Sequence, residues 1–245
     1  MSDYPHRDQL FNEPIDQIAD FAFDEKVAAV FPDMIKRSVP GYTTIVAMTG
    51  VIAERYATAN SNCYDLGCSL GASTLAMRQQ INAVGCQIYA IDNSPAMLDR
   101  CRSVLTIDNN NIPVELIEAD LLDIEITNAS VVVLNFTLQF IAKERRKQLI
   151  QRIYQGMNKG AILILSEKIY FEDQQLQKLN TDLHHEFKRL NGYSKLEIAQ
   201  KRTAIENILI PESIAEHQAR LTAAGFSSCD VWFQCFNFAS LVAVK

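Results

Sequence analysis

The chain of 245 residues lacks long hydrophobic runs and lacks an excess of positive charge. Apolar runs such as Val131–Leu134 are far shorter than the roughly 20 residues that cross a bilayer, and residues 1–20 are acidic and polar where a signal peptide would be basic and then apolar. Lys and Arg total 23 against 29 for Asp and Glu, a formal net charge of -6, whereas nucleic-acid-binding proteins usually carry a basic excess. We therefore expect a cytoplasmic protein that binds no membrane and no nucleic acid directly.

Spacings typical of metal and disulfide sites are also missing. The six cysteines contain no C-x-x-C pair, and the four histidines contain no H-x-x-x-H pair or Cys/His zinc spacing. Most of the cysteines lie in apolar stretches, which is typical of buried, reduced thiols. We predict no metal site. The residues concerned are Cys63, Cys68, Cys86, Cys101, Cys229, Cys235, His6, His184, His185 and His217.

What is present is an ordinary globular composition, with 48% hydrophobic and 21% charged residues, in a chain that suits one α/β domain. Short apolar segments alternate with amphipathic ones, and this alternation predicts parallel strands that are buried on both faces. The predicted strands are 62–66, 87–91, 114–117, 131–134, 161–167, 231–236 and 240–244, and the helices between them are 73–82, 95–106 and 143–155.

The two last strands are nearly adjacent in the sequence and can pair only as an antiparallel hairpin. Two helices, 24–36 and 42–56, precede the first strand within residues 1–58, and a charged helical insert covers residues 172–207. Such appendages would lie over the carboxyl edge of the sheet, where open α/β folds bind ligands. The prediction is a single domain over residues 1–245 with a mostly parallel seven-stranded sheet.

The segment Asp65–Thr74 is the most informative, because it joins a strand to a helix through small residues that let the backbone approach a ligand. It is no G-x-G-x-x-G dinucleotide loop, since Cys68 and Ser69 occupy the middle. Residues 67–71 match the G-x-S-x-G nucleophile elbow of hydrolases, although that elbow normally follows the fifth strand. The third interpretation is the first motif of an S-adenosylmethionine-binding Rossmann-like domain, with Ser69 in place of the middle glycine and with Gly67, Cys68 and Ser69 at the cofactor.

A second motif favours the S-adenosylmethionine interpretation. Strand two ends in Asp92 and Asn93, which places the Asp92 carboxylate where it accepts hydrogen bonds from both hydroxyls of a ribose. Ser94 and Pro95 then begin the next helix as N-cap and first helical residue. The alternative is a plain capping turn, which would need no acidic residue at the strand end.

The next two strands end in polar residues as well. Asp120 follows strand three, where such a site uses Asp to meet the adenine amino group and the next residue, Leu121, to cover the ring. Asn135 follows strand four, beside the expected position of the methionine moiety. A buried Asn at a strand end can instead simply hold a loop in place, so both interpretations of Asn135 stay open.

Several motifs together resemble the bacterial carboxy-S-adenosyl-L-methionine synthase family over nearly the whole chain. The first motif is shared by many methyltransferases, whereas the combination is specific to this family. The segments that carry the resemblance are 31–35, 37–42, 65–71, 92–97, 133–140, 165–168, 187–194 and 232–238.

The resemblance implies a class I methyltransferase fold with unusual chemistry. The family takes S-adenosylmethionine and prephenate; prephenate loses its ring carboxylate and water to give phenylpyruvate, and the carboxyl group ends on the former methyl carbon of the nucleoside through a sulfonium ylide. The product, carboxy-S-adenosyl-L-methionine, supplies a second enzyme that modifies the wobble uridine of tRNA. The resemblance also implies a homodimer, which the apolar hairpin 232–238 supports weakly.

The resemblance further assigns Arg202 to the added carboxylate, because a guanidinium presents two parallel N–H donors. The alternative for Arg202 is a helix-surface charge that pairs with Glu206 at i,i+4. It assigns Tyr42 to the cofactor, where the alternative is aromatic packing between helices. No general base is evident, and aromatisation of the ring drives the decarboxylation. Residues left as unassigned candidates for prephenate binding are Arg37, His184, His185, Tyr193 and Lys201.

Two other functions remain open. An ordinary S-adenosylmethionine-dependent methyltransferase acting on a small acidic molecule would use the same acidic residues, Asp65, Asp92 and Asp120. A non-catalytic nucleotide-binding partner of a tRNA-modifying enzyme is the third possibility. Turnover with prephenate separates the first function from the third, and methyl transfer to an acceptor identifies the second.

Overall fold

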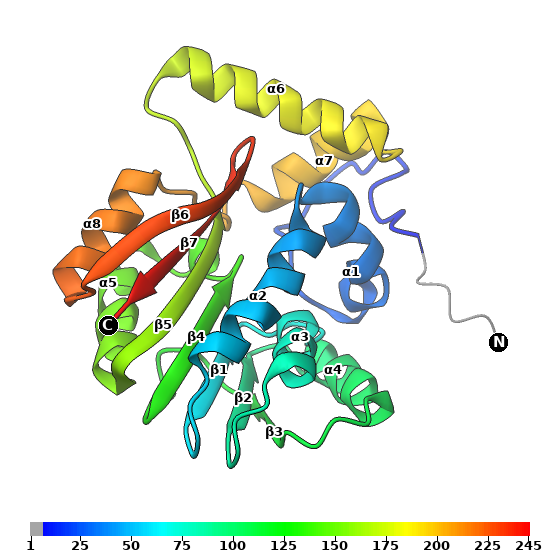
Figure 1. Cartoon of the computed structure of the whole chain (residues 1–245). Helices are drawn as coiled ribbons and strands as arrows, with labels where there is room; N and C mark the ends of the chain where they lie inside the picture. The colour runs from blue at the N-terminus through cyan, green and yellow to red at the C-terminus, as the bar shows by residue number, and fades with distance from the viewer. Residues whose placement is uncertain (1–6) are drawn as a thin grey trace.

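Five neighbouring strands of the sheet are parallel in the computed structural model, which describes residues 7–245 (Figure 1). The strand order is β3-β2-β1-β4-β5-β7-β6, and β7 pairs antiparallel with both β5 and β6. The predicted mostly parallel seven-stranded sheet with an antiparallel C-terminal hairpin is therefore confirmed. The strands are β1 (Asn62–Leu66), β2 (Gln87–Asp92), β3 (Val114–Glu118), β4 (Ala129–Asn135), β5 (Met157–Lys168), β6 (Ser228–Cys235) and β7 (Phe238–Val244).

Both faces of the central strands are buried, which explains their unbroken apolar sequence. Val132 and Leu134 of β4 face one way and pack with α5 (Lys143–Gly156) and α8 (Ile214–Ala224). Val131 and Val133 face the other way and pack with α2 (Tyr42–Tyr56) and α3 (Ala72–Gln80). Each such side chain contributes roughly 1.5–3 kcal/mol through its burial.

Local capping signals set the starts of most helices. Ser94 accepts a hydrogen bond from Met97 N–H and Pro95 is the first residue of α4 (Pro95–Ile107), so the predicted N-cap is confirmed. Asp24 caps α1 (Glu25–Ser38), and the predicted helical insert consists of α6 (Gln174–Leu190) and α7 (Lys195–Ile205). Figure 1 shows α6 and α7 above the sheet, with α1 beside them.

Two parts of the chain differ from the predicted elements. Strand β5 begins at Met157, four residues earlier than predicted, because its pairing with β4 continues past a register shift between Ala129 and Val131. Helix α8 was not predicted, although Ser213 and Glu216 form a capping box at its start and Gly225, with φ +111°, ends it. Both signals are visible in the sequence, so α8 was predictable.

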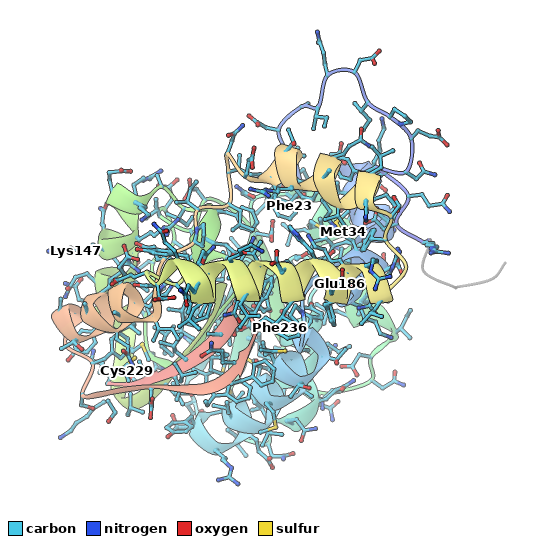
Figure 2. All side chains as sticks on the ribbon, turned by 90° about the horizontal axis from the view of Figure 1, so that it is seen from above. Phe23, Met34, Lys147, Glu186, Cys229 and Phe236 are labelled. Carbon is cyan, nitrogen blue, oxygen red and sulfur yellow. The ribbon has the colours of Figure 1, made fainter. Side chains whose placement is uncertain are left out.

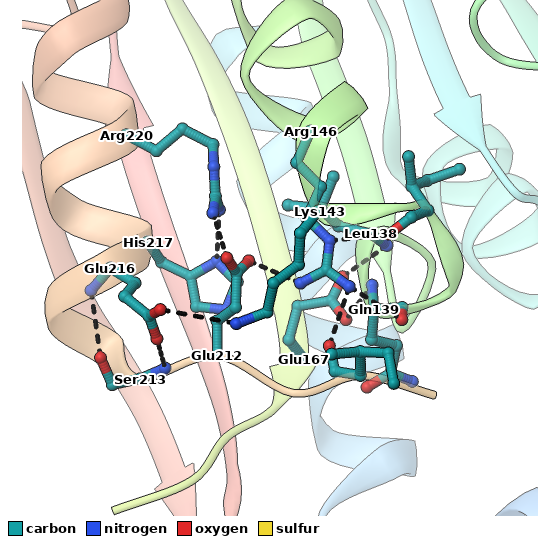
Figure 3. A network of polar contacts seen from close by, with 12 residues as sticks. Leu138, Gln139, Lys143, Arg146, Glu167, Glu212, Ser213, Glu216, His217 and Arg220 are labelled. Carbon is teal, nitrogen blue, oxygen red and sulfur yellow. Dashed lines mark hydrogen bonds and ion pairs between the residues drawn. The ribbon is translucent and has the colours of Figure 1, made fainter. Parts of the chain in front are cut away.

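A buried polar cluster fastens the loops that lead into the upper edge of the sheet (Figure 3). Arg146 of α5 is fully buried and pairs with Glu212, with 2.6 Å between Nη1 and Oε2. Its other nitrogens donate to the carbonyl oxygens of Gln139, Ile141 and Ile210. The loop after β4 and the loop after α7 are thereby tied to one side chain.

None of the helices in residues 7–245 is long and apolar enough to span a membrane. All six cysteines are free thiols in the described part of the chain, and four of them are buried. Within that same part, no group of three or more His, Cys, Asp or Glu residues is arranged to hold a metal ion, and His6 lies outside it.

Candidate active site

A cavity of about 620 Å³ lies at the carboxyl ends of the parallel strands, between the sheet and helices α1, α2, α6 and α7. This volume lies in the range of small-molecule sites, and the place is the one where open α/β sheets bind ligands. All ten residues that we singled out as cofactor-binding candidates line this one cavity: Tyr42, Gly67, Cys68, Ser69, Asp92, Asn93, Asp120, Leu121, Asn135 and Arg202.

The loop between β1 and α3 turns sharply through left-handed backbone. Gly67 has φ +81°, and a Cβ there would lie 2.3 Å from Oγ1 of Thr137, so glycine is required for both reasons. Ser69, which replaces the usual middle glycine, also has a positive φ of +50°. Ser69 therefore adopts the left-handed backbone conformation that glycine favours, so the loop does not need glycine at this position to make its turn.

Asp92 connects this loop to the end of β2. Oδ2 accepts the Ser69 N–H at 2.8 Å and Oδ1 accepts the Ser94 N–H at 2.9 Å. Burial raises the pKa of the Asp92 carboxyl, and the backbone N–H groups oppose that effect. Each oxygen retains a further lone pair, so the carboxylate can serve the capping turn and two ribose hydroxyls together.

Asp120 and Leu121 form the part of the wall that follows β3. Oδ1 of Asp120 accepts the Leu122 N–H at 2.8 Å, and Oδ2 lies 3.9 Å from a nitrogen of Arg145. Leu121 is buried and joins the main core, so its side chain is held in a fixed place beside the cavity. This arrangement suits an apolar cover for an adenine ring next to a hydrogen-bond acceptor.

Asn135 has every polar atom of its side chain occupied. Nδ2 donates to Ser73 at 2.9 Å and to Thr49 at 3.2 Å, and Oδ1 accepts from Ser166 at 2.6 Å. These bonds join α2, α3 and β5 at the end of β4. The structure thus gives Asn135 the holding role that we considered as its alternative, in a position that also faces the cavity.

Asp65 belongs to the first motif but does not line the cavity. It is buried beneath the loop, where its carboxylate accepts a hydrogen bond from the Thr74 hydroxyl at 2.5 Å. Burial raises its pKa to about 6, and the Thr74 bond opposes that shift. Asp65 therefore positions the start of α3.

The hydrolase interpretation of residues 67–71 is wrong. The loop follows β1, and the Ser69 hydroxyl donates to the sulfur of Met97 at 3.4 Å. Within the described residues, no histidine nitrogen lies within hydrogen-bond distance of that hydroxyl. Ser69 therefore has no activating histidine in the part of the chain that the structure describes.

Tyr42 begins α2 with its ring 6.1 Å from that of Phe136, centroid to centroid. Burial, with the charge of Asp65 adding to it, raises the pKa of the Tyr42 phenol well above its usual value. The phenol therefore stays protonated at physiological pH and can donate a hydrogen bond. Both the predicted cofactor contact and the predicted aromatic packing are compatible with this position.

Aromatic side chains from the N-terminal segment close one side of the cavity. Phe23 packs edge-on against Phe140 with 5.3 Å between ring centroids, and Phe31 and Met34 complete the same wall. Figure 2 shows Phe23 and Met34 beside α7, with α6 crossing over the molecule. These side chains give the part of the cavity beside the insert an apolar lining.

Another part of the cavity wall is cationic. Lys168 ends β5, Lys188 lies on α6, and Lys201 and Arg202 lie on α7, and all four line the cavity. The carboxylates that line the cavity are Asp92 and Asp120 at the loop end and Glu206 next to Arg202. The cavity thus has an acidic end at the strand loops and a basic end at the insert.

Arg202 shows both of the features between which the sequence could not decide. Its Nε lies 3.6 Å from Oε2 of Glu206, one helical turn away, and its side chain is 64% exposed. It also lines the cavity. The pair with Glu206 is exposed and therefore weak, so the guanidinium can exchange Glu206 for a bound carboxylate.

Three of the unassigned candidates for prephenate have partners within the protein. Arg37 and Tyr193 are not among the cavity residues; Arg37 pairs with Asp33, and the Tyr193 hydroxyl donates to Asp8. Lys201 reaches the cavity but donates to Ser38 at 3.1 Å and lies 3.5 Å from Asp8.

His184 and His185 both line the cavity. The carbonyl oxygen of Ser38 accepts a hydrogen bond from Nε2 of His184 at 2.8 Å, and burial lowers the pKa of this imidazole to about 2. His184 is therefore neutral.

Two cavity residues, Lys168 and Lys188, were not among the candidates from the sequence. Two signals could have identified them: Lys168 lies at the end of a strand, and Lys188 follows His184 by one helical turn.

The comparisons with known proteins agree with this geometry. The model of a methyltransferase domain family matches residues 64–160. Human N-acetylserotonin methyltransferase, solved in complex with SAM, superposes with a TM-score of 0.62 at 16% identity, covering 90% of this chain and 55% of that one. Sheet, loop and cavity together define a class I S-adenosylmethionine-dependent methyltransferase fold.

Two curated relatives extend over nearly the full length. The carboxy-S-adenosyl-L-methionine synthase of Trichlorobacter lovleyi is 62% identical over 239 residues, covering 97% of this chain and 98% of the relative. The protein of the same name from Vibrio campbellii is 58% identical over 238 residues, with 97% of each chain covered. The chain belongs to the carboxy-S-adenosyl-L-methionine synthase family.

Proposed function

We propose that the protein converts S-adenosylmethionine and prephenate into carboxy-S-adenosyl-L-methionine, phenylpyruvate and water. Family membership supports the product, and the division of the cavity into an acidic and a basic end is the observation that carries the assignment of the co-substrate. A nucleoside with a sulfonium cation suits the acidic end. A dicarboxylate suits the basic end, because fixed cations in a buried site compensate its charge.

Each end has residues suited to its ligand. Asp92 accepts the two ribose hydroxyls, and Asp120 accepts from the adenine amino group while Leu121 covers the ring. Tyr42 lines the same cavity with a protonated phenol that can donate a hydrogen bond. Arg202 binds the carboxylate that the product carries and the substrate nucleoside lacks.

The reaction also requires that the former methyl carbon of the nucleoside meets the carboxyl group released from prephenate in the absence of water. The aromatic wall around Phe23 and the two insert helices exclude water, and positioning alone can supply a large part of a rate enhancement. Aromatisation of the prephenate ring drives loss of the carboxyl group. The ring hydroxyl leaves as hydroxide and can take the proton from the methyl group, which forms the released water. No side chain needs to act as a general base in this scheme, and His184 donates its Nε2–H to Ser38.

Mass spectrometry of the nucleoside released from purified, denatured protein tests the proposal. A nucleoside heavier than S-adenosylmethionine by one carbon dioxide supports it, and so does formation of that nucleoside when prephenate is added. Methyl transfer to an acidic acceptor without any carboxylated product would instead identify an ordinary methyltransferase. Binding of the nucleoside without any turnover would identify a non-catalytic partner.

The wider role follows from the product. A carboxymethyl group on a sulfonium is an activated donor, so we propose that a second enzyme uses it to modify the wobble uridine of tRNA and that this protein contacts no tRNA itself. We also propose a homodimer in the cytoplasm. Light scattering of the purified protein would test the dimer, and a mass equal to one chain would contradict it.

A further inference from the structure

Lys168 and Lys188 are brought together by one phenylalanine. Lys168 is directly opposite Phe238 in the β5–β7 ladder, and residues that are directly opposite each other in an antiparallel pair share a face of the sheet. The His184 ring packs edge-on against the same Phe238, with 4.9 Å between centroids. Lys188 follows His184 by one turn of α6, so both ammonium groups reach the same end of the cavity.

These two lysines differ from the other cations of the cavity. Lys201 has Asp8 and Ser38 as partners, and Arg202 has Glu206. Within residues 7–245, neither Lys168 nor Lys188 has a carboxylate or a hydrogen-bond acceptor for its ammonium group. The side chain of Lys188 is nevertheless only 8% exposed.

Two neighbouring and unpaired ammonium groups, of which Lys188 is buried and Lys168 half-buried, oppose folding, because each has lost solvent and each repels the other. Lys188 shows the effect. Burial lowers its pKa to about 7, and the positive charges of Lys168, Lys201 and Arg202 contribute to that lowering. Burial also lowers the pKa of Lys168. An arrangement of this kind in a ligand cavity suits an anionic ligand that supplies the missing negative charge.

We propose that Lys168 and Lys188 together bind the carboxylate that stays on the donor, which is the 2-oxo acid carboxylate common to prephenate and phenylpyruvate. The inference rests on the proposed function. It divides the basic end of the cavity into two subsites, with Arg202 serving the carboxylate that reaches the nucleoside.

Transition-state energetics select the retained carboxylate. A carboxylate that leaves as carbon dioxide loses its negative charge in the transition state. Two cations bound to it would therefore stabilise the ground state more than the transition state and would slow the reaction. The 2-oxo acid carboxylate keeps its charge throughout. Two cations can hold it without raising the barrier, and they orient the ring toward the nucleoside.

The test uses Lys168→Met and Lys188→Met, with Lys178→Met as a matched control on the same helix, since Lys178 is 77% exposed and pairs with Asp182. Phenylpyruvate binding is measured by calorimetric titration in the presence of S-adenosylmethionine, which needs no turnover. We expect each cavity variant to weaken phenylpyruvate binding at least about tenfold and to raise the KM for prephenate similarly, because one charge-assisted contact is lost. S-adenosylmethionine affinity and the control variant should be unchanged within about twofold.

Two results would overturn the proposal. A raised KM for prephenate with unaltered phenylpyruvate binding would show that the lysines hold the transferred carboxylate, and unaltered binding of both ligands would show that they form no anion subsite. A folding defect is distinguished by the unfolding midpoint, which removal of an unpaired buried ammonium should leave unchanged or raise. Absence of product with the unmodified protein would contradict the proposed function separately, since the phenylpyruvate titration is measured without turnover.

Discussion

The backbone N–H of Ser69 lies 2.8 Å from Oδ2 of Asp92, so the loop after β1 is hydrogen-bonded to the end of β2. This bond links two motifs that are 23 residues apart in the sequence. It fixes the acceptor for the ribose relative to the backbone that approaches the rest of the nucleoside. Changes at either residue should therefore alter the affinity for every ligand that contains this nucleoside.

Asp92→Ala should weaken S-adenosylmethionine and its carboxylated form alike, roughly tenfold to hundredfold, because both contain the same ribose. Calorimetric titration with each ligand measures the two losses. Ser94→Ala is the control, since it removes the cap of α4 and the bond to the Phe23 carbonyl without removing the carboxylate. It should cost about 1 kcal/mol of stability and leave both affinities far less changed than Asp92→Ala does. A loss confined to one ligand would contradict the ribose role.

Arg202→Ala should retain S-adenosylmethionine binding and lose the preference for the carboxylated ligand, because the partner of the added carboxylate is gone. Glu206→Gln provides the opposite control. It removes the present partner of Arg202, so affinity for the carboxylated ligand should stay the same or rise. Competition binding with both nucleosides measures the preference, and a variant without Arg202 that still favours the carboxylated ligand would exclude the assignment.

Binding of phenylpyruvate should weaken as the pH rises above about 7, because burial lowers the pKa of Lys188 to about 7 and only its protonated form attracts an anion. The limiting slope is about tenfold per pH unit. Titrations between about pH 6 and about pH 9 measure it. The titratable and charged groups that face Lys188 are Lys168 on β5, Lys201 and Arg202 on α7, and His184 and His185 on α6.

The Lys188→Met variant is the control for this pH dependence. This variant should lose the part of the pH dependence that is centred near pH 7. Lys201 can still titrate in it, because burial lowers the pKa of Lys201 to about 8 while the charge of Asp8 opposes that shift. An identical profile in variant and unmodified protein would show that Lys188 is not the group responsible.

Arg146→Met should destabilise the protein by about 3–5 kcal/mol, because Glu212 would keep a buried charge with one fewer partner and three carbonyl groups would lose a donor. Lys147→Ala, on the exposed side of the same helix, should change stability by less than about 0.5 kcal/mol. Urea unfolding measures both. Equal effects of the two substitutions would refute the clamp role that Figure 3 shows for Arg146.

Gly67→Ala and Gly160→Ala separate backbone strain from steric conflict, since the two glycines have φ values of +81° and +79°. A Cβ at Gly160 meets nothing within 4 Å, whereas one at Gly67 meets Thr137. We expect about 1 kcal/mol of destabilisation for Gly160→Ala with normal S-adenosylmethionine affinity. Gly67→Ala should cost more stability and weaken the nucleoside as well, and unaltered affinity would show that the loop tolerates the shift.

Much of the fold and of the nucleoside end of the site was accessible from the sequence. Apolar strands that alternate with helices predict a parallel sheet, and in such a sheet the residues that follow each strand meet at one edge. Asp92, Asp120 and Asn135 lie at the ends of three such segments, so their meeting in one cavity follows from topology. The start of β5 did not follow, because the ends of a strand depend on its pairing with the neighbouring strand. Helix α8 could have been predicted from its capping box and from Gly225, which are local signals.

The sequence by itself determined the sheet, the loop after β1 and the acidic residues at the strand ends, because these depend on local pattern and on the handedness and order of βα units. Only the tertiary structure decided which cations are available to a ligand. Lys201 is paired with Asp8, 193 residues away in the chain, whereas Lys188 lies near Lys168 at the same end of the cavity and has no counterion within the described residues. Charge pairing of that kind depends on distance in space, which no local pattern encodes.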